Sequence, residues 1–173
     1  MSNQLPTDYQ SFIHKSRYAK YFDGKGRESW GDTVSRLMAF IDRPELDTKT
    51  KNQLEQAILG LEVMPSMRAL MTSGPAASRD NTCMYNCSFL PVDDLKSFDE
   101  AMFVLLCGTG VGFSVERQFI TKLPDVPQLF QSETNIVVRD SKEGWAKSLR
   151  QLIALLYAGE VPTWDVSKVR PAG

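Results

Sequence analysis

The sequence predicts a chain of mixed α and β structure, with a helical amino-terminal region in residues 1–63 and an α/β region in residues 64–173. Two observations carry this prediction. Apolar residues recur at helical spacing through the first region, whereas the second region alternates short strand-like runs with amphipathic helices. Such alternation of strand and helix is typical of an α/β sheet or barrel.

The first region contains three segments with a helical pattern, residues 8–22, 29–41 and 48–63. In the middle segment, apolar residues at i, i+3, i+4 and i+7 make a single stripe, formed by Val34, Leu37, Met38 and Ile41. Ser29 is placed to cap this helix. The loop "DGKGR" separates the first two segments, because two glycines so close together disfavour a continuous helix.

The α/β region begins with residues 64–82, which we expect to form a loop because they are rich in proline, glycine and small polar residues. They lead into "MYNCSFLPV", whose pattern predicts a buried strand. Side chains alternate across a strand, so one face would carry Tyr85, Cys87 and Phe89 and the other Asn86, Ser88 and Leu90.

A helix and a second strand follow. "SFDEAMFVLLC" predicts an amphipathic helix with Ser97 as its N-cap, and "VGFSVER" predicts a strand. The glycines between them superficially match a dinucleotide-binding fingerprint, but that motif leaves a strand and opens a helix, and here the order is reversed. Gly108 is better explained as the end of the helix, and Gly110 and Gly112 would allow a neighbour or ligand to approach the backbone closely.

The last part of the chain repeats the order of strand, helix and strand. "NIVVRD" predicts a strand, Ser141 and Gly159 bound a helix, and "TWDVSKV" predicts a further strand. The chain stops at Gly173 without a closing helix, and an α/β core that ended there would leave a sheet edge and an apolar sheet face uncovered. We therefore expect the chain to be part of a larger fold.

Composition excludes several classes of function. The chain has 173 residues, of which 42% are hydrophobic and 24% charged, and no apolar run approaches the roughly 18 residues that span a bilayer. The first residues lack a signal-peptide pattern, so we expect a cytoplasmic protein with no membrane partner and with reduced cysteines. The net charge is −1 and no stretch concentrates basic residues, so a nucleic acid polymer is not an expected partner.

The cysteines and the single histidine do not indicate a metal site. No pair has the CxxC spacing, and His14 lies in the first helical segment, where a surface position or a hydrogen-bonded helix position is expected. Cys83 and Cys87 are four residues apart on the predicted strand, too far for a disulfide of regular geometry. Cys107 ends an apolar helix face and is expected in the core.

A family resemblance rests on motifs that occur in order along the chain: "NCSFLPV", "GTGVGFSVERQFITKLP", "RDSKEGWAKSLRQLIALLYAGE" and "WDVSKVRPAG". Together they resemble the amino-terminal part of class II, adenosylcobalamin-dependent ribonucleotide reductases. The upstream stretches "YAKYF", "KGRESWGDTV" and "MPSMRALMTSG" are similar to the same family. The resemblance implies a ten-stranded α/β barrel preceded by helices, with residues 64–173 forming an incomplete first half of the catalytic barrel.

The resemblance also implies a reaction and a role for Cys87. These enzymes reduce ribonucleoside tri- or diphosphates to deoxyribonucleotides, the precursors for DNA replication, by a cobalamin-initiated thiyl radical mechanism. Cys87 stands where the family has one cysteine of a redox pair, which supplies electrons as the ribose 2′-hydroxyl leaves and then closes into a disulfide. The residues alone also allow Cys87 to be a small apolar core residue. The implied substrate-binding residues are Ser66, Asn86, Ser88 and Gly110, for which ordinary loop capping is the alternative.

An allosteric effector site is implied as well. Asp93 and Asp94 match the position at which many reductases bind the ribose of a deoxynucleoside triphosphate, and carboxylates suit hydroxyl donors. Arg117, Lys122 and Arg139 would hold its triphosphate. The alternatives are that the aspartates favour the start of a helix and that the basic residues form a solvated surface.

The family's radical cysteine, second redox cysteine, carboxy-terminal thiols and most of its adenosylcobalamin site would lie beyond Gly173. We therefore expect the chain to be inactive alone and to act with the missing carboxy-terminal part of the reductase and a thioredoxin-like reductant. Two alternatives stay open, a catalytically inactive, stand-alone deoxynucleotide-binding protein and a redox protein that uses Cys87 generically. The sequence does not decide between diphosphate and triphosphate substrates.

Overall fold

The structure is a computed structural model that describes residues 5–171. Its contacts divide the chain into two units, Met1–Tyr85 and Asn86–Gly173. Mixed helix and strand agree with the predicted class. The barrel and the boundary between residues 63 and 64 stay predictions. Gly173, at which an uncovered sheet edge was expected, lies outside the described residues.

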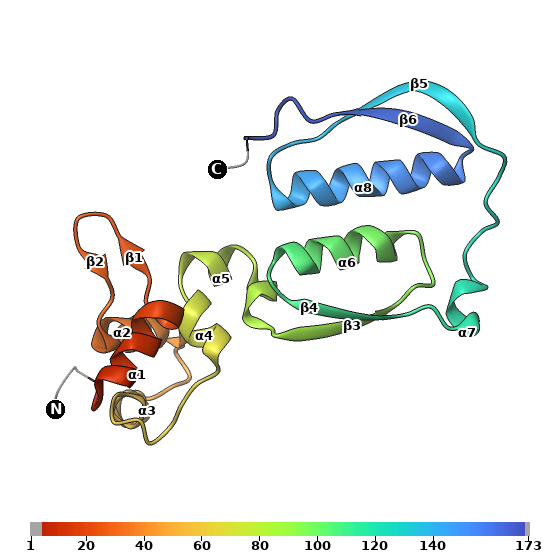
Figure 1. Cartoon of the computed structure of the whole chain (residues 1–173). Coiled ribbons are helices and arrows are strands. Elements are labelled where there is room, and N and C mark those ends of the chain that lie inside the picture. Colours follow the sequence, from red (N-terminus) through yellow and green to blue (C-terminus); the bar gives the residue numbers. More distant parts are fainter. Residues whose placement is uncertain (1–4, 172–173) are drawn as a thin grey trace. The chain divides into compact units, whose positions relative to one another are not determined.

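The first unit is mainly helical (Figure 1). In chain order its elements are α1 (Asp8–Ile13), the π-helix η1 (His14–Tyr18), the antiparallel strands β1 (Tyr21–Phe22) and β2 (Gly26–Arg27), α2 (Trp30–Ile41), α3 (Thr48–Leu59), α4 (Met67–Thr72), α5 (Pro75–Arg79) and the 3-10 helix η2 (Asn81–Met84). Ser29 caps α2 as predicted, by accepting a hydrogen bond from the backbone N–H of Asp32. The buried core of this unit consists of Trp30, Val34, Leu37, Ile58 and Leu70.

The loop predicted for residues 64–82 is wrong, because this segment contains two short helices. Ser66 caps α4, and its side chain accepts a hydrogen bond from Ala69 N at 3.0 Å. Pro75 stands at the start of α5, where the missing N–H of proline costs no hydrogen bond. The proline and the serine therefore mark helix starts here rather than a continuous loop.

A buried polar network joins the helices of the first unit through Glu28. Arg36 donates from Nε to Glu28 Oε1 at 2.7 Å and from Nη2 to Oε2 at 2.8 Å. The backbone N–H of Lys20 and the hydroxyl of Thr33 also donate to Oε2. Because Thr33 gives its only proton to Glu28, the 2.8 Å contact of His14 Nε2 with Thr33 Oγ1 has His14 as donor. His14 is thus buried and hydrogen bonded, the second of the two predicted environments.

Burial and hydrogen bonding shift the pKa values in this network. Burial lowers the pKa of His14, and the nearby Glu28 carboxylate only partly opposes that effect. Burial alone would raise the pKa of Glu28, but the hydrogen bonds from Arg36, Lys20 and Thr33 outweigh it and leave the pKa below its usual value. The network is therefore most favourable with Glu28 charged and His14 neutral.

The second unit contains two strand-helix-strand units (Figure 1). The elements are β3 (Cys87–Pro91), α6 (Lys96–Leu106), β4 (Gly110–Ser114), α7 (Arg117–Ile120), β5 (Phe130–Val137), α8 (Lys142–Tyr157) and β6 (Glu160–Asp165). β3 pairs with β4 and β5 with β6, both in parallel, which makes two separate two-stranded sheets. The predicted alternation of strand and helix is confirmed.

The helices α6 and α8 pack side by side in opposite directions. Asp99, near the start of α6, accepts hydrogen bonds from Arg150, in the middle of α8, at 2.8 Å and 2.6 Å. Cys107, at the end of α6, contacts Lys142, the first residue of α8, with 3.1 Å between Nζ and Sγ. The carboxyl ends of β3 and β5, which lead into these helices, therefore lie at opposite ends of the helix pair (Figure 1).

The predicted helix ends are mostly confirmed. Ser141 caps α8 by accepting from Gly144 N, and Gly108 and Gly159 follow α6 and α8 with φ of 86° and 87°. Ser97 is not a cap, because α6 begins one residue earlier and the Ser97 hydroxyl donates to Pro91 O at 3.0 Å.

No helix within residues 5–171 combines the length and the apolar content that crossing a bilayer requires.

Candidate functional site

Cys87 is the first residue of β3, and its side chain is exposed. Gly110 lies opposite it in the sheet register, and Gly110 N donates to Asn86 O at 2.9 Å. A Cβ at Gly110 would have only Asn86 O within 4 Å, at 3.5 Å, so the space beside the Cys87 backbone is open. The glycine thus leaves the thiol accessible from the neighbouring strand.

The prediction of a buried strand is wrong for the face that carries Cys87. Phe89, on the same face, is 65% exposed. Ser88 and Leu90, on the other face, are half-buried, since α6 contacts β3 and β4. Within residues 5–171 nothing comparable covers the Cys87 face. Tyr85, predicted in the strand, precedes it and ends η2.

The three cysteines differ in accessibility and none forms a disulfide. Cys83 lies in η2 rather than on a strand, is half-buried, and its thiol donates to Asp80 O at 3.2 Å. Cys107 is buried, which confirms its predicted core position. Cys87 is therefore the thiol most open to a substrate or another thiol.

Three of the four predicted substrate-binding residues lie beside Cys87. Asn86 precedes it, Ser88 follows it, and the Ser88 hydroxyl donates to Gly110 O at 3.2 Å. Ser66 belongs to the first unit and makes the capping bond of α4, the predicted alternative. The structure therefore groups Asn86, Ser88 and Gly110 with Cys87 and gives Ser66 a local structural role.

Four of the predicted effector residues follow β3 and β4 at their carboxyl ends. Lys122 Nζ donates to Asp93 Oδ2 at 2.9 Å, so these two form an ion pair across the sheet end. Asp94 Oδ1 accepts from Lys96 N at 2.8 Å, which is the helix-start role considered for it. Arg117 opens α7 and is exposed. This cluster combines carboxylates and basic side chains, the groups that suit a ribose and a triphosphate.

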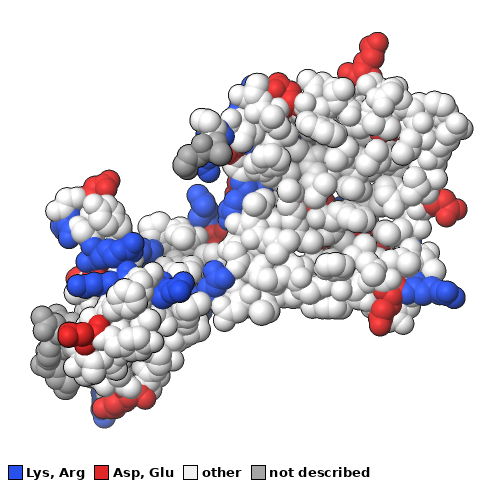
Figure 2. All heavy atoms as spheres, in the orientation of Figure 1, with Lys and Arg blue, Asp and Glu red and all other residues white. Residues whose placement is uncertain are grey.

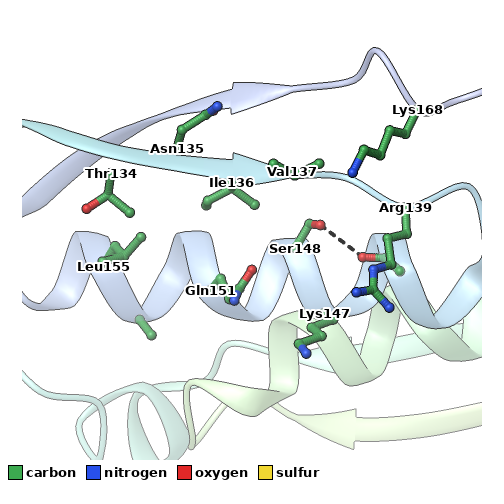
Figure 3. A pocket seen from close by; sticks show the side chains of 12 residues that line it. Thr134, Asn135, Ile136, Val137, Arg139, Lys147, Ser148, Gln151, Leu155 and Lys168 are labelled. Atoms are coloured by element: carbon green, nitrogen blue, oxygen red, sulfur yellow. Dashed lines mark hydrogen bonds between the residues drawn. The ribbon is translucent and has the colours of Figure 1, made fainter.

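Arg139 does not join that cluster. It follows β5 and so lies at the opposite end of the α6–α8 pair. There it lines a cavity of about 550 Å³ between β5 and α8 (Figure 3). The sequence did not indicate that Lys147 and Lys168 would line the same cavity, because neither belongs to a local motif with Arg139. Their proximity arises only when α8 packs on β5.

Sequence comparisons identify relatives of this chain. A ribonucleoside-triphosphate reductase of Lactobacillus leichmannii, described as adenosylcobalamin-dependent, is 28% identical over 172 aligned positions, which cover 79% of this chain. A protein of the same name from Lactobacillus delbrueckii subsp. bulgaricus gives the same values. The protein of that name from Euglena gracilis is 23% identical over 186 positions, covering 93% of this chain.

The chain is thus similar in sequence to adenosylcobalamin-dependent ribonucleoside-triphosphate reductases. It spans about a quarter of the length of these reductases, 23% for the Lactobacillus proteins and 25% for that of Euglena. The names describe oxidoreductases that act on ribonucleoside triphosphates and depend on adenosylcobalamin. No family model matches the chain, and no solved structure matches it.

Proposed function

We propose that this chain is part of an adenosylcobalamin-dependent ribonucleotide reductase, to which it contributes one redox cysteine and parts of the substrate and effector surfaces. The similarity to several ribonucleoside-triphosphate reductases supports this proposal and favours a triphosphate substrate. The observation that carries it is the position of Cys87, an exposed thiol at the start of a strand with a glycine opposite.

Reduction of a ribonucleotide requires a thiol that the substrate can reach. Replacing a ribose 2′-hydroxyl by hydrogen consumes two electrons and two protons and releases water. Two thiols supply both when they join as a disulfide, each giving one electron and one proton. Cys87 would be one of the two thiols, and the second would belong to the part of the reductase outside this chain. A strand is a suitable platform, because the reductant must be held at contact distance from the sugar.

The described residues do not by themselves fit adenosylcobalamin. The cavity between β5 and α8, about 550 Å³, is of ordinary size for a small ligand, and a corrin with its nucleotide arm is larger. His14, the single histidine, is buried against Thr33. The role proposed for this chain is therefore that of reductant and nucleotide contact, with the cofactor held by other parts of the reductase.

The effector surface would lie at the carboxyl ends of β3 and β4. The Asp93 carboxylate retains free lone pairs beside its bond to Lys122 and could accept from ribose hydroxyls. Lys122 and Arg117 would face the triphosphate. In this arrangement a bound deoxynucleoside triphosphate would sit at the end of β3, the strand that begins with Cys87, and would link effector binding to the position of the thiol.

The test is a reductase assay with cytidine and adenosine triphosphates, adenosylcobalamin and a dithiol, on the chain alone and mixed with the protein encoded directly downstream. We expect activity only in the mixture, and its loss in Cys87→Ser. Cys83→Ser is the matched control, since Cys83 is also a free thiol but lies in the first unit.

Two outcomes would contradict the proposal. Full activity of the Cys87→Ser mixture would remove the reductant role of this residue. No activity in any mixture, together with binding of a deoxynucleoside triphosphate by the chain alone, would favour the alternative of an inactive deoxynucleotide-binding protein.

A further inference from the structure

The end of α6 and the beginning of α8 hold a cysteine against a lysine. Lys142 Nζ lies 3.1 Å from Cys107 Sγ, although the two residues are 35 positions apart in the sequence. Cys107 ends α6, and Lys142 is the first residue of α8. The function proposed above uses neither side chain, since its reductant is Cys87. The contact is therefore a second place in the chain where a thiol meets a reactive group.

The lysine nitrogen has two partners on α6. Besides Cys107 Sγ, it stands over the ring of Phe103, 5.3 Å from the ring centroid, a distance typical of a cation–π contact. Phe103 and Cys107 are four residues apart, so their side chains are neighbours on one face of the helix. This face of α6 holds the nitrogen beside the sulfur.

Both members of the pair are withdrawn from solvent. Figure 2 shows that most of the visible face of the second unit is uncharged and that its charged side chains project mainly from the margins of that view. Lys142 is instead half-buried, and Cys107 is only 8% exposed. A buried thiolate requires a compensating cation, which the ammonium of Lys142 supplies. The contact therefore favours the thiolate, the form of cysteine that peroxides oxidise.

The other two cysteines are placed differently. Cys87 is exposed, so a sulfenic acid formed there would be open to other thiols and to further oxidation. The Cys83 thiol donates to Asp80 O at 3.2 Å. Lys20 is near Cys83, but its ammonium donates to Ser73 O at 2.7 Å. Cys107 is therefore the cysteine whose sulfur is in contact with an amine.

The acid next to the pair in sequence is Glu143. It follows Lys142, is exposed, and lines a cavity of about 510 Å³ with Asp99, Glu100 and Lys147. Its carboxylate can help to hold the Lys142 ammonium. A carboxylate forms no bond to nitrogen under oxidation, however, whereas sulfur does. Glu143 therefore contributes charge near the pair and does not compete for the covalent product.

We propose that Cys107 and Lys142 form an oxidative modification site, at which a peroxide joins the two side chains by a sulfur–nitrogen bond. In the first step the Cys107 thiolate attacks hydrogen peroxide and the O–O bond breaks. One oxygen stays on sulfur as a sulfenic acid, and the other leaves as hydroxide, which takes a proton from the Lys142 ammonium and becomes water.

The second step forms the bond. The Lys142 amine, now neutral, attacks Cys107 Sγ, the S–O bond breaks, and the hydroxyl group leaves with a proton from nitrogen as a second water. The pair loses two electrons in total, and these reduce one peroxide molecule. Sulfenic acids condense with a backbone nitrogen in the same way, and here the 3.1 Å contact supplies a side-chain nitrogen instead.

The bond would connect the end of α6 to the start of α8. A cross-link of this kind stabilises a fold mainly by constraining the unfolded chain. A dithiol reverses it: one thiol attacks the sulfur, the amine leaves with a proton, and the second thiol closes the reductant into a disulfide. The site would therefore stabilise the second unit reversibly under oxidising conditions, and it does not depend on reductase activity.

The test treats the 173-residue chain with hydrogen peroxide and analyses a tryptic digest by mass spectrometry without reductant. A bond at Lys142 blocks cleavage after this residue, so we expect residues 97–117 joined to residues 140–147. The joined mass should be about 2 Da below the sum of the two peptides, because two hydrogens are lost. Dithiothreitol should separate them. The oxidised chain should melt about 5 °C higher than the reduced chain.

Lys142→Arg is the decisive variant. It keeps a cation beside the sulfur, but a guanidinium stays protonated and is not a nucleophile, so no joined peptide should form. Lys147→Arg, a change of the same kind elsewhere on α8, is the matched control and should give the joined peptide. Cys87→Ser should also give it, so that loss of the reductant role and loss of this site are distinguishable.

Three results would contradict the proposal. Recovery of residues 97–117 unjoined from the oxidised parent chain, with Cys107 as a free thiol or a sulfinic acid, would overturn the site. Joining of Lys142 to the peptide that carries Cys83 and Cys87 would overturn the assignment to Cys107. A joined peptide without a rise in the melting temperature would overturn the stabilising effect.

Discussion

Lys122 Nζ donates to Asp93 Oδ2 at 2.9 Å, and this bond ties the segment after α7 to the end of β3. Both side chains are partly exposed, so the ion pair should contribute less than about 1 kcal/mol to stability. A structural contact of that size leaves both residues available for a ligand.

If the pair belongs to an effector surface, Asp93→Asn and Lys122→Gln should each weaken deoxynucleoside triphosphate binding about tenfold, with little change in the melting temperature. Fluorescence titration with a labelled deoxynucleotide measures the affinity, and Lys96→Gln should bind as the parent chain does. Unchanged affinity in both variants would leave the pair with a purely structural role.

The Glu28–Arg36 pair should matter far more for stability, because both side chains are largely buried. Arg36→Met leaves a buried carboxylate without its bidentate partner and should lower the free energy of unfolding by about 3 kcal/mol or more. Urea denaturation monitored by circular dichroism measures this. Lys51→Met, which breaks the exposed Lys51–Asp42 pair, should change stability by less than about 1 kcal/mol. Equal changes in the free energy of unfolding for the two variants would show that the buried pair contributes no more to stability than the exposed one.

The lowered pKa of His14 predicts that the first unit loses stability in mild acid. Because burial lowers the pKa of His14 in the folded chain, the neutral form is favoured by folding. This contribution is complete above the unfolded pKa of about 6.5 and is lost as the pH falls from there toward the lowered folded pKa. The melting temperature should therefore drop between pH 7.5 and pH 5.5.

His14→Gln supplies the control, since an amide N–H can still donate to Thr33 but does not titrate. This variant should have a smaller drop over the same interval. Glu28, whose pKa is lowered, adds a further loss only at more acidic pH, as it takes up a proton. An identical drop in the parent chain and His14→Gln would assign the acid sensitivity to other groups.

Gly144→Ala should destabilise the second unit, although alanine is the better helix former. The added Cβ would collide with the backbone of Arg139, which must then move away from α8. We expect a loss of about 1–3 kcal/mol, typical of overpacking, in thermal unfolding. Gly112→Ala is the control, because its Cβ would meet its nearest atoms at 3.7 Å, an ordinary contact. Comparable stability of the two variants would argue against tight packing at Gly144.

Local patterns in the sequence were sufficient for much of the fold. Ser141 and Gly159 bound α8 because capping and left-handed termination depend on neighbouring residues only. Ser97 was misassigned because its hydroxyl finds a tertiary partner, Pro91 O, that no local pattern specifies. The helices in residues 64–82 were missed because proline and serine serve helix starts as well as loops.

The candidate site was predictable only where one motif holds its residues. Cys87, Asn86 and Ser88 are contiguous, so the sequence groups them directly. The separation of Arg139 from Asp93 depends on the antiparallel packing of α6 and α8, which the resemblance to a barrel did not indicate. The cavity at Lys147 and Lys168 depends on the same packing. Charges brought together by helix packing leave no signature in local spacing.

The two-stranded sheets of the second unit have a practical consequence. In each sheet, among the described residues, every strand is paired on one side only, and four aromatic side chains of these strands are more than 60% exposed, Phe89, Phe113, Phe130 and Trp164. Unpaired edges beside exposed aromatic side chains are templates for aggregation. At high concentration, copies of the isolated chain should therefore associate by pairing strands at these open edges. Binding measurements on the chain should be made at low micromolar concentration.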